Sequence, residues 1–189
     1  MSLTKSQLRR QALAARNQQQ SKDAVSNAII DRVLSLPPYV RAAVALWYVD
    51  VRDEVRTRGA LREAITSDKK IVVPYCVNKS LRLFHLQSMD ELQAAAFGIL
   101  EPRQELRSLT DKNITADALD FIIVPGVAFS PERQRLGHGK GYYDRLLSTV
   151  PESTTKVGVA FDCQIIKSIP SDPHDIAMDV VLTQSRMFT

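Results

Sequence analysis

The stretch ALDFIIV (Ala118 to Val124) is the most strongly β-branched apolar run in the chain, and the other elements can be ordered around it. Such a run is typical of a strand buried on both faces, as in a parallel sheet covered by helices. Further strands are predicted at Val40 to Tyr48, Lys70 to Tyr75, Leu81 to Leu86, Lys156 to Phe161 and Asp179 to Thr183. We therefore expect a sheet with Ala118 to Val124 as a central strand.

Helical patterns alternate with these strands. The first 36 residues read as helix, opened by a T-x-x-Q capping box at Thr4 and Gln7 and stopped by Pro37 and Pro38. The polar stretch NQQQSKD leaves open whether this segment is one long helix or two shorter ones. Other helices are predicted at Thr57 to Ser67, Met89 to Ala96 and Tyr142 to Val150. Strands separated by helices indicate an α/β fold with a mostly parallel sheet, although the strand order stays open.

Length and composition are those of an ordinary globular protein. The 189 residues fit a single domain, predicted over 1–189, and 44% hydrophobic with 24% charged residues excludes a wholly disordered chain. Apolar runs such as Ala42 to Val49 are too short to cross a bilayer, and the first residues lack the apolar segment of a signal peptide. Cys76 and Cys163 lie far apart, so we expect reduced thiols, no zinc site and a cytoplasmic location.

The charge balance permits an anionic ligand without selecting one. Lysine and arginine outnumber acidic residues by 25 to 21, which leaves a net charge of +4. The basic residues are dispersed, only 6% of residues are aromatic, and no known nucleic-acid-binding signature appears. We therefore expect no nucleic-acid partner.

A glycine cluster follows the predicted central strand. Of only seven glycines in the chain, three fall within five residues, as Gly137, Gly139 and Gly141 in RLGHGKGYYDR. Glycines let backbone N–H groups approach an anion, and the start of the following helix adds positive potential. Arg135, Lys140 and Arg145 add full positive charge, so the segment is a candidate phosphate cradle. Its G-x-G-x-G spacing matches neither the P-loop nor the dinucleotide fingerprint, and a plain flexible loop is the alternative.

Charged residues lie on both sides of this cluster. Asp144 follows it and could hold Mg²⁺ beside phosphate, or could simply stabilise the first turn of a helix. Lys5, Arg9 and Arg16 are spaced by four and seven residues, so they share one face of the first helix. This face is a second candidate anion-binding element, and a solvated charged face is its alternative.

A separate group of residues could contact a polar heterocycle. Glu54 follows the first predicted strand, at the edge of an α/β sheet where ligands bind, so it could meet a polar edge of a substrate or could equally be a residue at the start of a helix. His138 lies within the glycine cluster, and Tyr142 and Tyr143 could stack on a planar ring or pack against the sheet. Ser130 lacks the nucleophile-elbow context, which argues against a hydrolase with a catalytic triad.

The segment PGVAFSPERQRLGHGKGYYDRLL (Pro125 to Leu147) resembles the signature of the 5-formyltetrahydrofolate cyclo-ligase family, also called 5,10-methenyltetrahydrofolate synthetase. The family pattern is P-G-V-A-F, a variable polar stretch and R-L-G-x-G-x-G-Y-Y-D-R. KSQLRR, DEVRT and HDIAMDVVLT also match the family's K-x-x-L-R, E-V-x-T and H-D-x-x-x-D-x-V-x-T, in the same order. The resemblance covers nearly the whole chain.

The resemblance implies a ligase that uses ATP and Mg²⁺ to convert 5-formyltetrahydrofolate to 5,10-methenyltetrahydrofolate, releasing ADP and phosphate. In the implied scheme ATP phosphorylates the formyl oxygen, N10 attacks the formyl carbon, and phosphate leaves as the ring closes. The resemblance also implies a three-layer Rossmann-like sandwich with a mostly parallel central sheet and an N-terminal helix. We expect a monomer whose partner is the small-molecule folate, with no membrane association.

The resemblance also implies roles for individual residues. The implied catalytic residues are Lys140, Arg135 and Tyr142. The implied Mg²⁺ ligands are Asp144 and Asp175, with Asp179 ranked below Asp175. The implied folate-binding residues are Val49, Glu54, His138, Gly139, Lys140, Gly141 and Tyr142. The implied ATP-binding residues are Lys5, Ser6, Gln7, Leu8, Arg9, Arg135, Leu136, Gly137, His138, Gly139, Lys140, Gly141, Tyr142 and Tyr143.

Two alternative functions differ in what they require of these residues. Another ATP-dependent enzyme on the same scaffold would keep the glycine cluster and alter the loop around Glu54. A non-catalytic nucleotide- or RNA-binding module would lose Asp144 or the glycines. This chain retains all of these features, which favours the cyclo-ligase.

Overall fold

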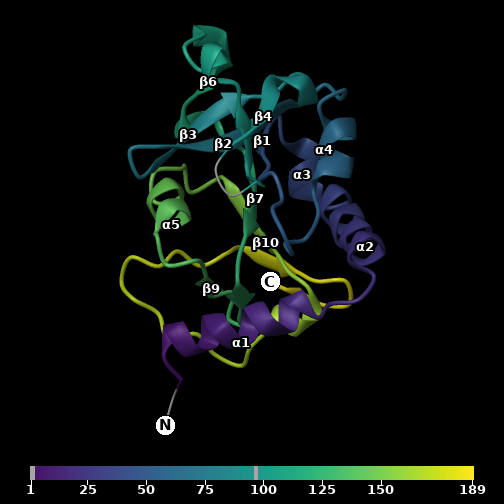
Figure 1. Cartoon of the computed structure of the whole chain (residues 1–189), viewed down its shortest axis with the longest axis vertical. Coiled ribbons are helices and arrows are strands. Elements are labelled where there is room, and N and C mark those ends of the chain that lie inside the picture. Colours follow the sequence, from purple (N-terminus) through teal and green to yellow (C-terminus); the bar gives the residue numbers. More distant parts are fainter. Residues whose placement is uncertain (1–2, 96–97) are drawn as a thin grey trace.

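The computed structural model describes residues 3–95 and 98–189, and within them the chain folds around an eight-stranded sheet (Figure 1). Parallel strands form the middle of this sheet and lie in the order β11, β10, β7, β1, β2. Their bounds are β1 (Val44–Leu46), β2 (Lys70–Val77), β7 (Phe121–Pro125), β10 (Thr155–Val159) and β11 (Val180–Leu182).

Antiparallel strands complete the edges of the sheet. They are β12 (Met187–Phe188) beside β11, β3 (Ser80–His85) beside β2, and β6 (Asn113–Ile114) beside β3. Two small hairpins lie outside the sheet, formed by β4 (Leu92–Ala94) with β5 (Leu100–Pro102) and by β8 (Ala128–Phe129) with β9 (Arg135–Leu136).

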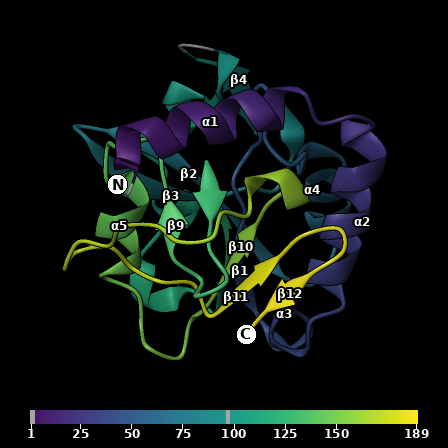
Figure 2. The ribbon, with the colours of Figure 1, turned by 90° about the horizontal axis from the view of Figure 1, so that it is seen from below.

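Helices cover both faces of the sheet. In Figures 1 and 2 the helices α2, α3 and α4 lie on one side of the sheet and α5 lies on the other. The first helix, α1, crosses below the sheet, from the side of α5 to the side of α2. The bounds are α1 (Lys5–Asn17), α2 (Lys22–Leu34), α3 (Pro37–Arg41), α4 (Arg58–Ala64) and α5 (Tyr142–Leu147). Short 3₁₀ turns connect other elements at Met89–Glu91, Gln104–Leu106, Thr110–Lys112, Ala116–Ala118 and Asp162–Gln164.

The central strand β7 explains the layered architecture. Phe121 and Ile123 belong to the core cluster under α2–α4, whereas Ile122 and Val124 belong to the cluster under α5. Alternate side chains of a strand point to opposite faces, so a strand covered by helices on both sides must be apolar throughout. The predicted three-layer α/β fold with a mostly parallel sheet is confirmed.

Several predicted elements have different bounds. The first 36 residues form two helices, α1 and α2, separated by a turn in which Ser21 has a left-handed φ of 49°. Pro37 begins α3, because proline fits the first turn of a helix, and Val40 lies in this helix outside β1. The Met89 to Ala96 helix is wrong: a 3₁₀ turn leads into β4, whose pairing with β5 overrides the helical pattern. Ala96 itself lies outside the described residues.

The strand order predicts where a ligand binds. Counted along the chain, the five parallel strands have the order 2-1-3-4-5, in which the connections leave β1 and β7 toward opposite edges of the sheet. Ligands in such sheets bind outside the carboxyl ends of the strands at this switch point. The loops after β1 and β7 carry Glu54 and the glycine cluster, so both predicted site segments meet there.

A buried ion pair fastens the connection between β3 and β6. Lys112 is only 5% exposed, donates a hydrogen bond to Gln87 Oε1 at 2.7 Å and forms an ion pair with Glu91. Burial acts to raise the pKa of Glu91, but the Gln87 backbone N–H and the Lys112 ammonium outweigh it and hold that pKa below its ordinary value. The folded state therefore favours the ionised form of Glu91.

We predict that Glu91→Gln lowers the free energy of unfolding by about 1–3 kcal/mol at pH 7, because Lys112 stays buried without its counter-charge. A lowered pKa stabilises the fold above the unfolded-state value of about 4.3 and loses that effect as the pH falls. The difference from the parent chain should shrink in urea titrations below about pH 4. Glu63→Gln, at an exposed position of α4, is the control. A difference that stays constant down to pH 3 would contradict the assignment.

Candidate active site

A cavity of about 1320 Å³ opens at the carboxyl ends of the parallel strands. It is lined by the loop after β1, the segment from β9 into α5, one face of α1 and the segment 172–176. The site residues implied by the sequence come together there: Lys5, Arg9, Val49, Glu54, Arg135, Leu136, Gly137, His138, Gly139, Lys140, Gly141, Tyr142, Tyr143, Asp144 and Asp175.

Each glycine of the predicted cradle is covered by an arginine. A Cβ added at any of the three glycines would lie within 3.4 Å of a guanidinium group. The pairs are Gly137 with Arg135, Gly139 with Arg9, and Gly141 with Arg145. At Gly137 and Gly141 the added Cβ would be only 2.9 Å from an arginine nitrogen, so glycine allows a closer approach there, whereas at Gly139 the 3.4 Å contact with Arg9 is an ordinary one.

Two of these glycines also have backbone angles that other residues rarely adopt. Gly139 has φ of 88° and Gly141 has φ of 65°, both in the left-handed region. Gly141 directly precedes α5, so its conformation sets the direction in which the chain enters that helix. The segment is thus a shaped turn rather than a plain flexible loop.

Arg135 holds the inner side of the cradle. Its Nη2 donates to Asp144 Oδ1 at 2.6 Å, and its guanidinium lies 5.6 Å from the centre of the Tyr143 ring. Arg135 is only 8% exposed. Burial, together with the charge of Glu54, raises the pKa of Tyr143 far above its ordinary value, so its phenol stays protonated. Asp144 is therefore positioned at the cavity by an arginine of the same segment.

The start of α1 is held at the cavity by a second ionic cluster. Lys5 Nζ lies 2.6 Å from Asp172 Oδ2 and 2.5 Å from Asp175 Oδ2. Burial acts to lower the pKa of Lys5, but the two carboxylates outweigh it and raise that pKa above its ordinary value. Asp175 lines the cavity, whereas Asp179 accepts a hydrogen bond from the Lys156 backbone outside the lining.

Only one face of α1 reaches the cavity. Arg9 Nε donates to the carbonyl of Gly137 at 2.8 Å, which ties the helix to the cradle. The cavity lining does not include Ser6, Gln7 or Leu8, all predicted to bind ATP. Gln7 completes the capping box with Thr4, and Leu8 is buried in the core cluster that joins α1 to β8 and β9. The helical period turns Gln7 away from both Lys5 and Arg9.

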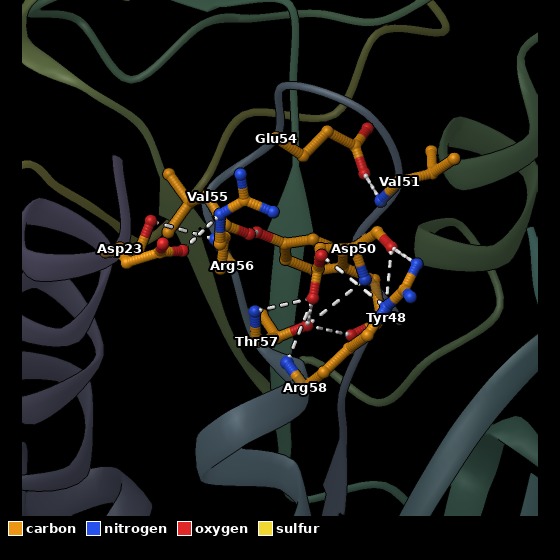
Figure 3. Close-up of polar contacts among 10 residues, drawn as sticks. Asp23, Tyr48, Asp50, Val51, Glu54, Val55, Arg56, Thr57 and Arg58 are labelled. Atoms are coloured by element: carbon orange, nitrogen blue, oxygen red, sulfur yellow. Dashed lines mark hydrogen bonds and ion pairs between the residues drawn. The ribbon is translucent and has the colours of Figure 1, made fainter. Parts of the chain in front are cut away.

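The loop after β1 is built around Asp50 (Figure 3). The carboxylate of Asp50 accepts hydrogen bonds from the backbone N–H groups of Thr57 at 2.8 Å and Arg58 at 2.9 Å. The Thr57 hydroxyl donates to the carbonyl of Tyr48 at 2.8 Å. These bonds close the loop between β1 and α4 and hold Glu54 at its tip.

Glu54 is a nearly buried carboxylate, 9% exposed, that faces the cavity. Its Oε2 accepts a hydrogen bond from the backbone N–H of Val51 at 3.1 Å (Figure 3). Its Oε1 lies 3.9 Å from His138 Nε2 and accepts no hydrogen bond from the residues that the structure describes. One carboxylate oxygen therefore remains available to a ligand that donates N–H bonds. The contact with His138 also joins this loop to the cradle.

Other cavity residues differ in exposure. Lys140 is exposed and forms no ion pair with the described residues, so its ammonium is available to an anionic ligand in the cavity. Tyr142 lies beneath Arg145, whose guanidinium is 5.4 Å from the ring centre. Val49 is buried and forms part of the apolar wall beside Glu54.

Some cavity residues were not among the predicted site residues. They include Arg16, Tyr48, Tyr75, Glu101 and Asp172. Of these five, only Arg16 could be recognised from the sequence, because it shares the basic face of α1 with Lys5 and Arg9. Tyr75 and Glu101 come from β2 and β5, which only tertiary packing brings to the cavity. Within the described residues, no helix is both long and apolar enough to span a membrane.

The lining of the cavity combines two kinds of charged group. Arg9, Arg135 and Lys140 supply positive charge, which suits phosphate. Glu54 supplies a carboxylate among apolar and aromatic residues, which suits a planar ring that carries N–H donors. His138 lies between them, within 3.9 Å of Glu54. The arrangement can bring a phosphorylated donor and a heterocyclic acceptor together.

Comparison with known proteins gives a consistent family assignment. Residues 1–184 match the 5-formyltetrahydrofolate cyclo-ligase family. The chain is 31% identical to a probable 5-formyltetrahydrofolate cyclo-ligase of Schizosaccharomyces pombe, over 99% of this chain and 98% of that protein. It is 30% identical to the 5-formyltetrahydrofolate cyclo-ligase of Escherichia coli K12, over 95% and 97% of the two chains.

Solved structures agree with the fold. The 5,10-methenyltetrahydrofolate synthetase of Aquifex aeolicus superimposes with a TM-score of 0.83 at 34% identity, covering 98% of this chain and 92% of that one. A synthetase of the same name from Mycoplasma pneumoniae, 20% identical, superimposes with a TM-score of 0.76 over 96% and 99% of the chains. At that identity the second likeness supports the fold alone.

The close contact between Gly137 and Arg135 predicts a steric effect. Gly137→Ala would place a Cβ 2.9 Å from Arg135 Nη1, and the displaced guanidinium would lose its bond to Asp144. We expect the free energy of unfolding to fall by about 1–3 kcal/mol in urea titrations. Gly59→Ala, in α4 with open space around it, is the control and should be neutral or stabilising by up to about 1 kcal/mol. Equal stability of the two variants would contradict the prediction.

Proposed function

The chain belongs to the 5-formyltetrahydrofolate cyclo-ligase family, and on that basis we propose that it converts 5-formyltetrahydrofolate to 5,10-methenyltetrahydrofolate with ATP and Mg²⁺. The observation that carries the proposal is that Glu54 and the cationic cradle line one cavity, with His138 between them. Phosphoryl transfer depends mainly on positioning and charge compensation, which such a cavity can supply.

In the proposed reaction the formyl oxygen attacks the terminal phosphorus of ATP and ADP leaves. N10 of the folate then attacks the activated formyl carbon, and the C–O bond to phosphate breaks as the new ring closes. A formyl oxygen on an amide nitrogen is a poor leaving group, which is why this scheme requires phosphorylation. The chain's task is to align the two substrates and to stabilise the transferred negative charge.

The cationic part of the cavity lining is the proposed ATP site. Lys5 and Arg9 would contact the nucleotide from α1, while Arg135 to Tyr143 would surround its phosphates. Lys140 is exposed and lines the cavity beside the glycine cluster, so we assign it the main role in charge compensation. Arg135 would act beside it, and Tyr142 would position the reacting groups.

The lining around Glu54 is the proposed folate site. The free oxygen of Glu54 would accept N–H bonds from the amino edge of the pteridine ring, with Val49 packing nearby. The segment His138 to Tyr142 would lie between this ring and the phosphates. Within this segment, His138 Nε2 lies 3.9 Å from Glu54 Oε1, which supports placing the formyl group beside His138.

Asp144 and Asp175 fit the proposed Mg²⁺ site by their chemistry. Both offer carboxylate oxygens, the ligand type that Mg²⁺ prefers, and both line the cavity. Each already attracts a cationic side chain, Arg135 for Asp144 and Lys5 for Asp175. Bound there, the ion would offset the charge of the phosphate oxygens. Asp179 is the weaker candidate, because its carboxylate is engaged by Lys156 away from the cavity.

Four further expectations are part of the proposal. The chain would act as a single domain and as a monomer, since both proposed substrate sites lie in one cavity of one chain. It would have no nucleic-acid partner, and the two free cysteines support a cytoplasmic location.

The alternative ATP-dependent enzyme on this scaffold would need a different loop around Glu54.

The direct test measures absorbance in the methenyl-folate band with 5-formyltetrahydrofolate and Mg²⁺, with and without ATP. An ATP-dependent rise is expected. ATP binding without a rise would favour an enzyme with another substrate. Neither ATP binding nor a rise would overturn the ATP site as well.

We predict that Lys140→Ala lowers kcat by about 10²- to 10³-fold, because positive charge is lost at the transferred phosphate. The melting temperature should not change, since Lys140 is exposed and forms no ion pair with the described residues. Lys167→Ala, at an exposed position outside the cavity lining, is the control. Normal turnover of Lys140→Ala would overturn the assignment.

We predict that Glu54→Gln raises the Kd of 5-formyltetrahydrofolate by roughly 10- to 100-fold, the loss expected for a hydrogen bond to a charged group. The Kd of ATP should stay within about twofold, because Glu54 is not among the proposed ATP contacts. Titration calorimetry with each ligand separately measures both values. Glu152→Gln, exposed and outside the lining, is the control. Equal losses for the two ligands would indicate a structural role instead.

A further inference from the structure

Arg16 is a buried cation that the proposed reaction does not use. It lies in the last turn of α1, is 5% exposed and lines the cavity. Among the described residues it forms no ion pair, and its Nε has no hydrogen-bond partner. Its one hydrogen bond to the described residues is long, from Nη1 to the carbonyl of Gly126 at 3.4 Å.

A guanidinium in this situation is costly to the empty protein. Burial removes its hydration, and an arginine cannot relieve the cost by losing its proton. Buried charges are normally paired with an opposite charge or fully hydrogen-bonded. A favourable interaction with the end of α1 accounts for a positive residue at this position, but it leaves Nε without a partner. The missing partner is therefore expected to be a ligand oxygen.

The position of Arg16 places it near the loop that carries Glu54. It follows Arg9 by seven residues, which is about 10 Å along the helix axis, so it lies further along α1 than the residue that contacts the cradle. Its Nη1 reaches the carbonyl of Gly126 just after β7, and β7 pairs with β1, whose end leads into the loop of Glu54. Arg16 and Glu54 also both act on the buried hydroxyl of Tyr48: burial and Glu54 raise its pKa, whereas Arg16 lowers it.

Arg16 and Glu54 line the same cavity, carry opposite charges and form no ion pair with each other. Opposite charges in a poorly hydrated site attract strongly. The lack of an ion pair is explained if a ligand lies between them and presents a donor edge to the carboxylate and an acceptor to the guanidinium. The pteridine ring of a folate has this pattern, because its 2-amino group and N3–H adjoin the 4-oxo oxygen.

We propose that Arg16 is a substrate-binding residue that donates hydrogen bonds to the 4-oxo oxygen of the pteridine ring, beside the edge bound by Glu54. This assignment rests on the proposed folate function and adds a specificity determinant to it. A site that donates to a carbonyl oxygen rejects a ring in which an amino group replaces that oxygen, because two donors would then face each other. Arg16 should therefore select 4-oxo over 4-amino pteridines.

The test compares 5-formyltetrahydrofolate with its 4-amino analogue in titration calorimetry without ATP. For Arg16→Met we expect the Kd of the 4-oxo ligand to rise roughly 10- to 100-fold, with little change for the 4-amino ligand. The preference of the parent chain for the 4-oxo ring should largely disappear, and the Kd of ATP should not change. Arg16→Lys, which keeps the charge, should retain part of the preference and remains informative if Arg16→Met does not fold.

Arg10→Met is the matched control, since Arg10 is exposed on the same helix and outside the cavity lining. It should bind all three ligands as the parent chain does. If both Arg16 variants keep the full preference for the 4-oxo ring, or weaken both pteridines equally, the assignment is overturned while the proposed function stands. If the parent chain binds neither 5-formyltetrahydrofolate nor its analogue, the proposed function fails and the assignment fails with it.

Discussion

The packing of three guanidinium groups against three glycines is the constraint on which the site depends. Like charges repel, and the interaction is stronger where water is partly excluded. Arg9, Arg135 and Arg145 nevertheless converge on one short segment, because the glycines leave room for them and carbonyl or carboxylate oxygens hold each one. The result is a concentration of positive charge that an anion would relieve. This positive charge lies at the switch point of the sheet, where the substrates of α/β proteins bind.

The helix α1 turns this edge of the sheet into an enclosed cavity. It crosses the carboxyl ends of the strands (Figure 2) and is anchored through Lys5 at its start and through Arg9, which is bonded to the cradle, while Arg16 is buried near its end. The apolar side of the same helix packs on β8 and β9. One helix therefore contributes a phosphate contact and a folate contact to the proposed site. This placement explains why a basic helical face with ordinary spacing lies inside the protein rather than in solvent.

The fold class could be predicted from local patterns because β7 is apolar at every position and the helices show their own period. The Met89 to Ala96 prediction failed where β4 pairs with β5, a contact between segments that a local pattern does not encode. At the site, the glycine cluster and Glu54 were recognisable as motifs. The burial of Arg16 was not, since a position on a charged face reads as solvated until the path of the helix is known.

The amino-acid sequence was sufficient for the α/β class, the cradle and the family resemblance, because each depends on residues close together in the chain or on a linear motif. Three-dimensional packing determined the strand order, the pairing of Lys5 with Asp175 and the burial of Arg16 with an unpartnered Nε. The physical reason is that burial and electrostatic pairing depend on contacts between distant segments. Spacing along the chain places a charge on one face of a helix, but only the neighbours of that face determine whether the charge has a partner.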